Sequence, residues 1–427
     1  MSVRDRVGEV WRAARGVSPP GHLDAAGCNV PSDRVLDAVT AQLRRERERG
    51  GYAAVPDLTA TRAAPAALVG AAPQDVAFLE SGTAAMAALL GGWRLGPGAR
   101  VGCARTEYGG TLMLLRRLAG RRGWRLVELP VDGAARIDPD GVRARLAAGL
   151  DLVVVSHVGS HHGVVQPARE IGALCRAAGV PFVLDVCQSL GHVEVRGTGA
   201  SAYVGTSRKW LAGPRGVGLL IVPALTAGIG APAPAMDAPP LGTDGTDAPA
   251  PGTDAPAPGT DAPAFAMDAP APTLSGHLWR GPDDDLAAAG EPVPVPGAAR
   301  YEGSEGAIAA RLGLGVAARE HLDLGPPAVH AHLAGLGRAA RELLDGAGGW
   351  RVAEPLGEPS ALVTLKPPPG DTAERAAARA REASLLVGVV PVARAPLHLR
   401  EPVLRVSPPP GTPPETLHAL ARVLAAR

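Results

Sequence analysis

Short apolar runs alternate with amphipathic helical patterns along residues 71–222, and this alternation restricts the chain to one class of fold. Strand–helix–strand order implies a mainly parallel sheet with helices on both of its faces. Residues 152–155 are one leucine and three valines, a run typical of a strand that is covered on both faces. The sequence therefore predicts an α/β fold, in which ligands bind beyond the carboxyl ends of the strands. The strands are expected at residues 76–79, 100–103, 125–129, 152–155, 181–184 and 202–205.

The rest of the chain is expected to divide around this large domain, which is predicted to span residues 51–230. An N-terminal segment, residues 1–50, should pack on the small domain and on the site. Residues 273–300 should return to the large domain, and residues 301–427 should form a smaller α+β domain that closes over the site. In this small domain the patterns indicate helices at 306–318, 372–383 and 413–426 and strands at 350–352, 361–365 and 403–407.

Residues 231–272 repeat a seven-residue unit, for example Ala-Pro-Ala-Pro-Gly-Thr-Asp at 248–254 and again at 255–261. A period of seven suggests a coiled coil, but proline in every unit is incompatible with a helix. Because the segment has almost no large apolar side chain, it is predicted to be a disordered, partly polyproline-II insertion. A tolerated expansion in a surface loop is favoured over a docking segment.

Charge and hydropathy exclude several classes of function. Lys and Arg total 43 against 42 Asp and Glu, so the chain lacks the basic excess of a nucleic-acid-binding protein. No run of about 18 apolar residues is present, and the charges near the N-terminus argue against a secretion signal. The four cysteines form no CxxC pair, which indicates neither a disulfide framework nor a metal site. A cytoplasmic protein that binds no nucleic acid, membrane or metal is expected.

Lysine is nearly absent from the chain: only Lys209 and Lys366 occur, and the other 41 of the 43 basic residues are arginine. Arginine supplies charge but cannot deprotonate or form an imine, so a retained lysine is a candidate for amine chemistry. Lys209 follows a predicted strand, next to hydroxyl groups and Arg208, and precedes a glycine-rich loop at 213–218. This setting is suited to a lysine that binds pyridoxal phosphate (PLP) beside a phosphate site.

Two further motifs would complete such a site. Asp185 ends a predicted buried strand 24 residues before Lys209, and a carboxylate there can keep the pyridinium nitrogen of PLP protonated. Ser81-Gly82-Thr83 stands at a strand-to-helix junction, where N–H groups and the helix dipole hold a phosphate. Taken singly, these residues have ordinary explanations as an N-cap, a turn and a surface charge. Their order on an α/β sheet favours the cofactor site.

Motifs of one enzyme family occur in order along nearly the whole chain outside the repeat. They are His-Leu-Asp at 22–24, Gly-Gly-Tyr at 50–52, Glu-Tyr-Gly at 107–109, Ser-His-His-Gly at 160–163, Gln-Pro at 166–167, Asp-Val-Cys-Gln at 185–188, residues 207–218, 308–311 and 402–408. With these motifs the chain resembles the class V, fold-type I PLP enzymes, the family of the cysteine desulfurases and the isopenicillin N epimerase-like proteins. Within that family it is most similar to the hercynylcysteine sulfoxide lyases of ergothioneine biosynthesis.

The resemblance implies PLP as the cofactor and a role for each matching residue. Lys209 would bind the cofactor covalently and move the substrate proton, and Asp185 would pair with the ring nitrogen. Arg405 would bind the substrate α-carboxylate, for which a guanidinium fork is suited. The remaining cofactor contacts expected are Ser81, Gly82, Thr83, Tyr108 stacked on the ring, Ser160, Gln188 near the phenolic oxygen, Thr206, Arg208 and, from the partner subunit of a homodimer, Ser304. Further candidate substrate contacts are Tyr52, His161 and Arg215.

The reaction that the resemblance implies is a carbon–sulfur β-elimination on hercynylcysteine sulfoxide, giving a sulfenic acid, pyruvate and ammonia. An external thiol would then reduce the sulfenic acid to ergothioneine. No cysteine follows Cys187, so the chain lacks the mobile sulfur-accepting thiol of a desulfurase, and Cys187 is expected to be a packing residue. An aminotransferase, an epimerase or another cysteine-conjugate lyase would use the same residues, and these alternatives stay open. A non-catalytic binding protein with this fold is a less favoured alternative.

Overall fold

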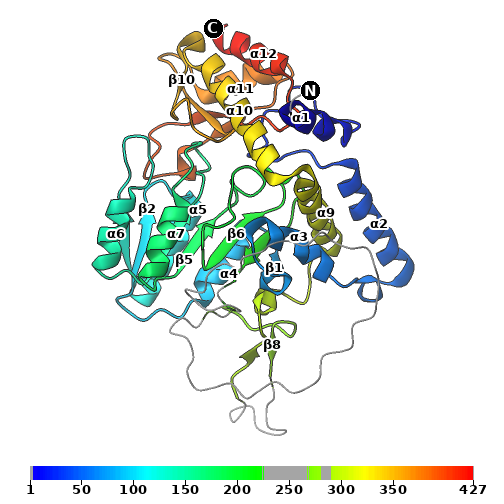
Figure 1. Cartoon of the computed structure of the whole chain (residues 1–427), viewed down its shortest axis with the longest axis vertical. Helices are drawn as coiled ribbons and strands as arrows, with labels where there is room; N and C mark the ends of the chain where they lie inside the picture. The colour runs from blue at the N-terminus through cyan, green and yellow to red at the C-terminus, as the bar shows by residue number, and fades with distance from the viewer. Residues whose placement is uncertain (1–2, 224, 226–266, 268, 280–289, 427) are drawn as a thin grey trace.

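A seven-stranded sheet lies at the centre of the computed structural model, which describes residues 3–223, 225, 267, 269–279 and 290–426 (Figure 1). Its strand order is β1-β7-β6-β5-β4-β2-β3. The strands from β2 to β6 run parallel, whereas β7 is antiparallel to both β1 and β6. The bounds are β1 Val76–Leu79, β2 Arg100–Ala104, β3 Arg125–Leu129, β4 Leu152–Ser156, β5 Phe182–Asp185, β6 Ala202–Thr206 and β7 Gly218–Ile221. The predicted α/β fold with a mainly parallel sheet is confirmed.

Helices cover both faces of this sheet, and alternate residues of β4 show why residues 152–155 are all apolar. Val153 and Val155 pack into one core with α3 (Thr59–Val69), α6 (Pro139–Ala147), α7 (Ala168–Ala177) and α9 (Ile308–Leu324). Leu152 and Val154 point to the opposite core, with α4 (Gly82–Gly92) and α5 (Gly109–Arg122). All five residues of β4 are buried, as a strand covered on both faces requires.

A second, smaller sheet carries the C-terminal part of the chain, at the top of Figure 1. Its four antiparallel strands have the order β10-β11-β13-β12. The bounds are β10 Arg351–Val352, β11 Val363–Lys366, β12 Gly388–Val390 and β13 Val403–Val406, with α10 Pro326–Leu344, α11 Ala373–Glu382 and α12 Pro414–Ala425 packed on them. The strand β12 was not predicted, because Gly-Val-Val before Pro391 is too short to show an alternating pattern.

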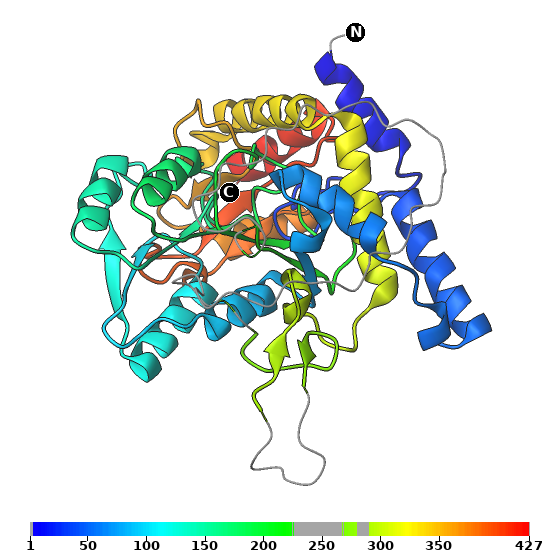
Figure 2. The same cartoon turned by 60° about the horizontal axis from the view of Figure 1, so that its bottom comes forward.

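The N-terminal residues run along this small sheet before they reach the large one. Helix α1 (Val3–Ala13) packs on α10, and α2 (Asp33–Arg49) packs on α9 (Figures 1 and 2). Between these two helices, His22 pairs with Leu386 and Asp24 pairs with Ser407 in parallel bridges. These bridges bring Asp24 next to β13, and so next to Arg405.

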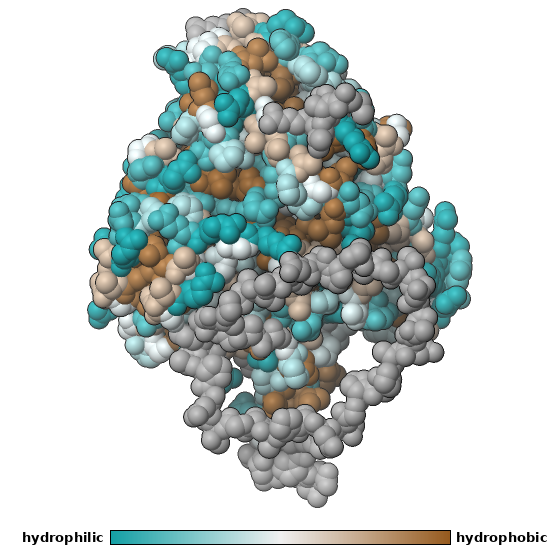
Figure 3. Space-filling view, in the orientation of Figure 1, coloured by the Kyte–Doolittle hydropathy of each residue, from teal (hydrophilic) through white to brown (hydrophobic). Residues whose placement is uncertain are grey.

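The remaining described segments are short. They are η1 Tyr52–Ala54, η2 Pro73–Asp75, the paired strands β8 His277–Leu278 and β9 Val293–Pro294, η4 Ala298–Tyr301, η5 Ala347–Gly349 and η6 Val392–Arg394. Most of the predicted insertion at 231–272 lies outside the described residues. Among the described helices, none is long and apolar enough to cross a membrane. On the face in Figure 3, hydrophobic side chains occur in separate areas between hydrophilic ones.

Candidate active site

A cavity of about 360 Å³ lies at the carboxyl ends of the parallel strands, which is where the fold class predicts a ligand. Eleven of the residues predicted for the site line this cavity: Ser81, Gly82, Thr83, Tyr108, Ser160, Asp185, Gln188, Thr206, Arg208, Lys209 and Arg215. They lie at or just beyond the carboxyl ends of β1, β2, β4, β5 and β6, so the sheet brings together residues that are far apart in the sequence. Four predicted residues, Tyr52, His161, Ser304 and Arg405, are not among those that line it.

Lys209 follows β6 and faces the cavity beside Asp185 and Cys187. Desolvation lowers the pKa of Lys209 to about 8, and the negative charge of Asp185 opposes this shift. An amine with a pKa near 8 is a far better base and nucleophile at neutral pH than an exposed lysine. Burial, together with the negative charge of Asp185, raises the pKa of the Cys187 thiol well above its usual value, so the thiol stays protonated. Cys187 therefore lines the cavity as an inert thiol rather than as a thiolate.

Asp185 is the last residue of β5, and a second, buried carboxyl, that of Glu107, lies near it. Asp185 Oδ1 accepts a hydrogen bond of 2.8 Å from the Cys187 N–H, and the Asp185 backbone is in register with Ser156 on β4. Ser156 donates from its hydroxyl to the fully buried Glu107 at 2.6 Å. Burial raises the pKa of Glu107 to about 8, so this carboxyl carries a proton at neutral pH. The Glu-Tyr-Gly motif contained Glu107, but the sequence assigned it no role.

The phosphate-binding end predicted at Ser81-Gly82-Thr83 is the N-terminus of α4. Ser81 is the N-cap, and its Oγ accepts from the Ala84 N–H at 3.1 Å. A Cβ on Gly82 would lie 2.5 Å from Cys187 Sγ and 3.1 Å from the Gly205 carbonyl, so only glycine fits there. Helix N-termini hold phosphate through free N–H groups and the helix dipole. Thr206 and Arg208 line the same cavity, and the Arg208 guanidinium donates to the Gly27 carbonyl.

The Gln188 amide is held in one orientation by two neighbours. Its Oε1 accepts from Trp210 Nε1 at 2.9 Å, and its Nε2 donates to the Ala26 carbonyl at 3.1 Å. Trp210 is itself stacked on His192, with ring centroids 3.7 Å apart. Since a primary amide has two N–H groups, one remains to donate into the cavity. This suits the predicted contact with an oxygen of the cofactor.

Arg405 lies on β13, beside the cavity rather than in its wall. Its Nη2 forms an ion pair of 2.9 Å with Asp24 Oδ1, and its Nη1 donates to the Ser160 carbonyl at 3.0 Å. Its buried Nε–H has no hydrogen-bond partner within the described residues. The predicted carboxylate-binding group is thus partly engaged by Asp24, a residue of the His-Leu-Asp motif that was assigned no role from the sequence.

Ser160 and His161 were both predicted at the site, and the structure separates them. Ser160 lines the cavity, and its buried Oγ is without a hydrogen-bond partner in the described part of the chain. His161 instead places Nε2 at 2.7 Å from His398 Nδ1, and its backbone carbonyl accepts from Thr364 Oγ1. The expectation that His161 contacts the substrate therefore has no support in this geometry.

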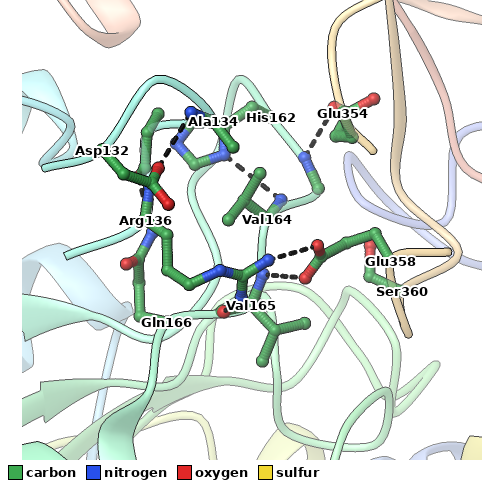
Figure 4. A network of polar contacts seen from close by, with 12 residues as sticks. Asp132, Ala134, Arg136, His162, Val164, Val165, Gln166, Glu354, Glu358 and Ser360 are labelled. Atoms are coloured by element: carbon green, nitrogen blue, oxygen red, sulfur yellow. Dashed lines mark hydrogen bonds and ion pairs between the residues drawn. The ribbon is translucent and has the colours of Figure 1, made fainter. Parts of the chain in front are cut away.

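The loop after Ser160 is held by carboxylates from the small domain (Figure 4). The Gly163 N–H donates to Glu354 at 2.7 Å, and the Val165 N–H donates to Glu358 at 2.7 Å. Arg136 forms an ion pair with the same Glu358 at 2.6 Å. Each contact joins the large domain to the small one, so the position of this loop depends on how the two domains fit.

Tyr52 and Ser304 lie together on the outer surface of the molecule. Tyr52 is 83% exposed and donates from its hydroxyl to Glu305 at 2.5 Å. Ser304 is exposed beside Glu305. Within one chain neither reaches the cavity, so any role in a site requires a second subunit.

One cavity residue that the sequence analysis missed comes from the small domain. Arg394, in η6, lines the cavity, and its guanidinium carbon lies 5.6 Å from the ring centroid of Tyr108. No local pattern distinguishes it from the other arginines of this arginine-rich chain, because only the tertiary fold brings η6 to the cavity.

Comparison with known proteins assigns this arrangement to a family. The family model described as aminotransferase class-V matches residues 23–228. A probable hercynylcysteine sulfoxide lyase from Mycobacterium tuberculosis is 36% identical over 99% of this chain and 94% of its own length. The chain belongs to the class V aminotransferase family. A probable cysteine desulfurase from Methanothermobacter thermautotrophicus is 27% identical, over 47% of this chain and 52% of its own length.

Solved structures of this family share the fold. A cysteine desulfurase from Thermococcus onnurineus has a TM-score of 0.75 at 18% identity, covering 100% of this chain and 98% of its own. The cystine C-S lyase C-DES in complex with cysteine persulfide has a TM-score of 0.74 at 19% identity, covering 96% and 98%.

The cavity suits PLP, the cofactor of this family: it combines a desolvated lysine, a strand-end carboxylate and a helix N-terminus where only glycine fits. The class V chain is accordingly a PLP-dependent carbon–sulfur lyase.

Proposed function

We propose that this enzyme cleaves hercynylcysteine sulfoxide by β-elimination, giving the sulfenic acid of ergothioneine, pyruvate and ammonia. The observation that carries the proposal is the 36% identity to a probable hercynylcysteine sulfoxide lyase, which extends over 99% of the chain. In sequence, two probable cysteine desulfurases match only about half of the chain, at 27% and 29% identity. Since no cysteine follows Cys187, and Cys187 is a desolvated thiol, a desulfurase reaction lacks its sulfur acceptor.

Binding of the substrate is assigned to the residues around Arg405. Two guanidinium nitrogens of Arg405 would hold the substrate α-carboxylate: Nε, whose N–H has no partner within the described residues, and Nη2, which is also paired with Asp24. Ser160, with its unpaired hydroxyl in the cavity wall, would donate to the cofactor or to the bound substrate. Both groups are positioned by one hydrogen bond, from Arg405 Nη1 to the Ser160 carbonyl.

Proton transfer is assigned to Lys209. When bound, PLP supplies an electron sink that stabilises negative charge at the substrate α-carbon. With its pKa lowered to about 8, the Lys209 amine takes the α-proton at neutral pH. Asp185, at the end of β5, would keep a proton on the cofactor ring nitrogen, and the free Gln188 amide N–H would donate to an oxygen of the cofactor.

The sulfoxide makes the carbon–sulfur bond easier to break, because a sulfenate is a better leaving group than a thiolate. The bond breaks with its electron pair on sulfur, and the three-carbon fragment takes up water to give pyruvate and ammonia. An external thiol then reduces the sulfenic acid: two thiols become one disulfide, and water leaves. We further infer a cytoplasmic homodimer, in which Ser304 and Tyr52 of one subunit approach the cavity of the other.

The test is release of pyruvate by the purified PLP-loaded protein with hercynylcysteine sulfoxide, cysteine sulfoxide or cysteine as separate substrates. We expect turnover that strongly favours the hercynyl substrate. Equal turnover of all three would remove the proposed specificity. Bound cofactor without pyruvate from any of them would move the function to transamination or epimerisation.

A further inference from the structure

Three histidines from the two domains meet next to the active site. His161 and His162 directly follow Ser160, and His398 follows η6 in the small domain. One nitrogen of each histidine lies within 4.8 Å of the others. His161 and His162 are 1% and 4% exposed, whereas His398 is only half-buried. None of the three lines the cavity, so the reaction proposed above makes no use of them.

The three rings lie close to one another at steep angles. Their centroids are 4.3, 5.0 and 5.6 Å apart, and their planes cross at 87°, 74° and 78°. Imidazoles bound tetrahedrally to Zn²⁺, with Zn–N distances of about 2.0–2.1 Å, have ring centroids about 5 Å apart. We propose that His161, His162 and His398 form a binding site for a divalent transition metal such as Zn²⁺, with three imidazole ligands and one open position.

The hydrogen bonding of the cluster supports this assignment. His161 Nδ1 and His162 Nε2 are buried without a hydrogen-bond partner in the described part of the chain. Buried polar atoms are nearly always paired, so two such nitrogens in adjacent rings call for an explanation, which a bound ion supplies. Coordination through His162 Nε2 requires the ring proton on Nδ1, so the 3.2 Å hydrogen bond from the Val164 N–H to Nδ1 would be lost.

The rings are in the protonation state that a metal needs. Burial lowers the pKa of His162 to about 3 and also lowers the pKa values of His161 and His398. Neutral imidazole is the ligand form, so no proton has to leave at pH 7. Nitrogen ligands favour zinc, nickel, copper or cobalt over the oxygen-binding ions Mg²⁺ and Ca²⁺.

Surrounding charges determine what the open position accepts. Lys366, Arg105 and Arg400 face His398, and Arg136 faces His162. These cations would repel a dication held by three neutral imidazoles, so the fourth ligand is expected to be an anion, such as chloride or hydroxide, that offsets this charge. The half-buried His398 provides the route from solvent. The bound ion would tie the small domain to the loop that carries Ser160.

The experiment uses tag-free, PLP-loaded protein treated with a chelator and then titrated with Zn²⁺ against a chromophoric competitor. We expect one equivalent of zinc and a higher melting temperature in the wild type. His398→Ala should weaken binding by more than about 100-fold, since loss of a ligand costs at least as much as loss of its supporting partner. The control is His418→Ala, an exposed histidine of α12, which should bind zinc like the wild type.

X-ray absorption of the zinc-loaded wild type gives a readout that needs no variant. Three nitrogen neighbours at about 2.0 Å are expected. No zinc uptake by the wild type, equal affinity in His398→Ala, or fewer than three nitrogen neighbours would each overturn the proposal. All of these readouts are independent of the substrate, so they stand whether or not the hercynyl substrate is confirmed.

Discussion

The ion pair between Asp24 and Arg405 allows a quantitative test of how the substrate carboxylate is bound. The side chains are 29% and 11% exposed, and their nitrogen and oxygen are 2.9 Å apart. A hydrogen bond to a charged group contributes about 1.5–3 kcal/mol. Since 1.36 kcal/mol corresponds to a factor of ten, loss of this hydrogen bond should lower kcat/KM by about 10–100-fold if Asp24 holds Arg405 in place. We therefore expect Asp24→Ala to lower kcat/KM by that factor.

The change should appear as a higher KM with an unchanged kcat, because the substrate carboxylate would be bound equally in the ground state and in the transition state. Asp24→Asn keeps an oxygen acceptor for Arg405, so its kcat/KM should fall by only about 3–10-fold. In order of decreasing kcat/KM, the three proteins should be the wild type, Asp24→Asn and Asp24→Ala. Steady-state pyruvate release measures this, and Asp140→Ala on the exposed side of α6 serves as the control. An unchanged KM in Asp24→Ala would refute the positioning role. A lower KM would mean that Asp24 competes with the substrate for Arg405.

Three further predictions concern the cofactor end of the site. Lys209→Ala should lose the visible absorption of bound PLP and all pyruvate release, whereas the exposed control Lys366→Ala should keep both. Gly82→Ala should lower PLP affinity by at least about 10-fold, measured by absorption titration, because the new Cβ meets Cys187 Sγ at 2.5 Å; unchanged affinity would contradict the close packing. The folded-state pKa of Glu107 is raised to about 8, so the native state binds more protons than the unfolded state above pH 4.5. Its contribution to stability is full below that pH and is lost as the pH rises through 8, so the melting-temperature difference between Glu107→Gln and the wild type should grow between pH 5 and 8. A constant difference would show that Glu107 is ionised in the native state.

The local sequence pattern predicted six of the seven strands of the large sheet, all except β7, and a few of the cavity residues at their ends. The apolar run in β4 indicates a strand that is buried on both faces. Asp185 is the last residue of β5, and Lys209 follows the end of β6. In a parallel sheet these ends share one edge, so position in the sequence translates directly into position at the site. The same reasoning gave Ser81 and Gly82, because a strand-to-helix turn places them at a helix N-terminus.

The pattern was insufficient where contacts between distant segments decide the direction of a side chain. Ser160 and His161 both follow β4, yet only Ser160 faces the cavity, since Thr364 and His398 of the small domain hold His161 on the other side. Asp24 meets Arg405 across 381 residues because of a bridge to Ser407. Neither contact leaves a periodic signal in the sequence.

Several contacts between distant segments hold one loop, which follows Ser160. The small domain holds the loop after Ser160 through Glu354, Glu358 and Thr364, while Arg405 binds the Ser160 carbonyl. Arg405, which is proposed to bind the substrate carboxylate, and the Ser160 hydroxyl in the cavity wall are therefore joined to the same domain. Any movement of the small domain would move both groups together, so a substrate carboxylate on Arg405 would also set the position of Ser160.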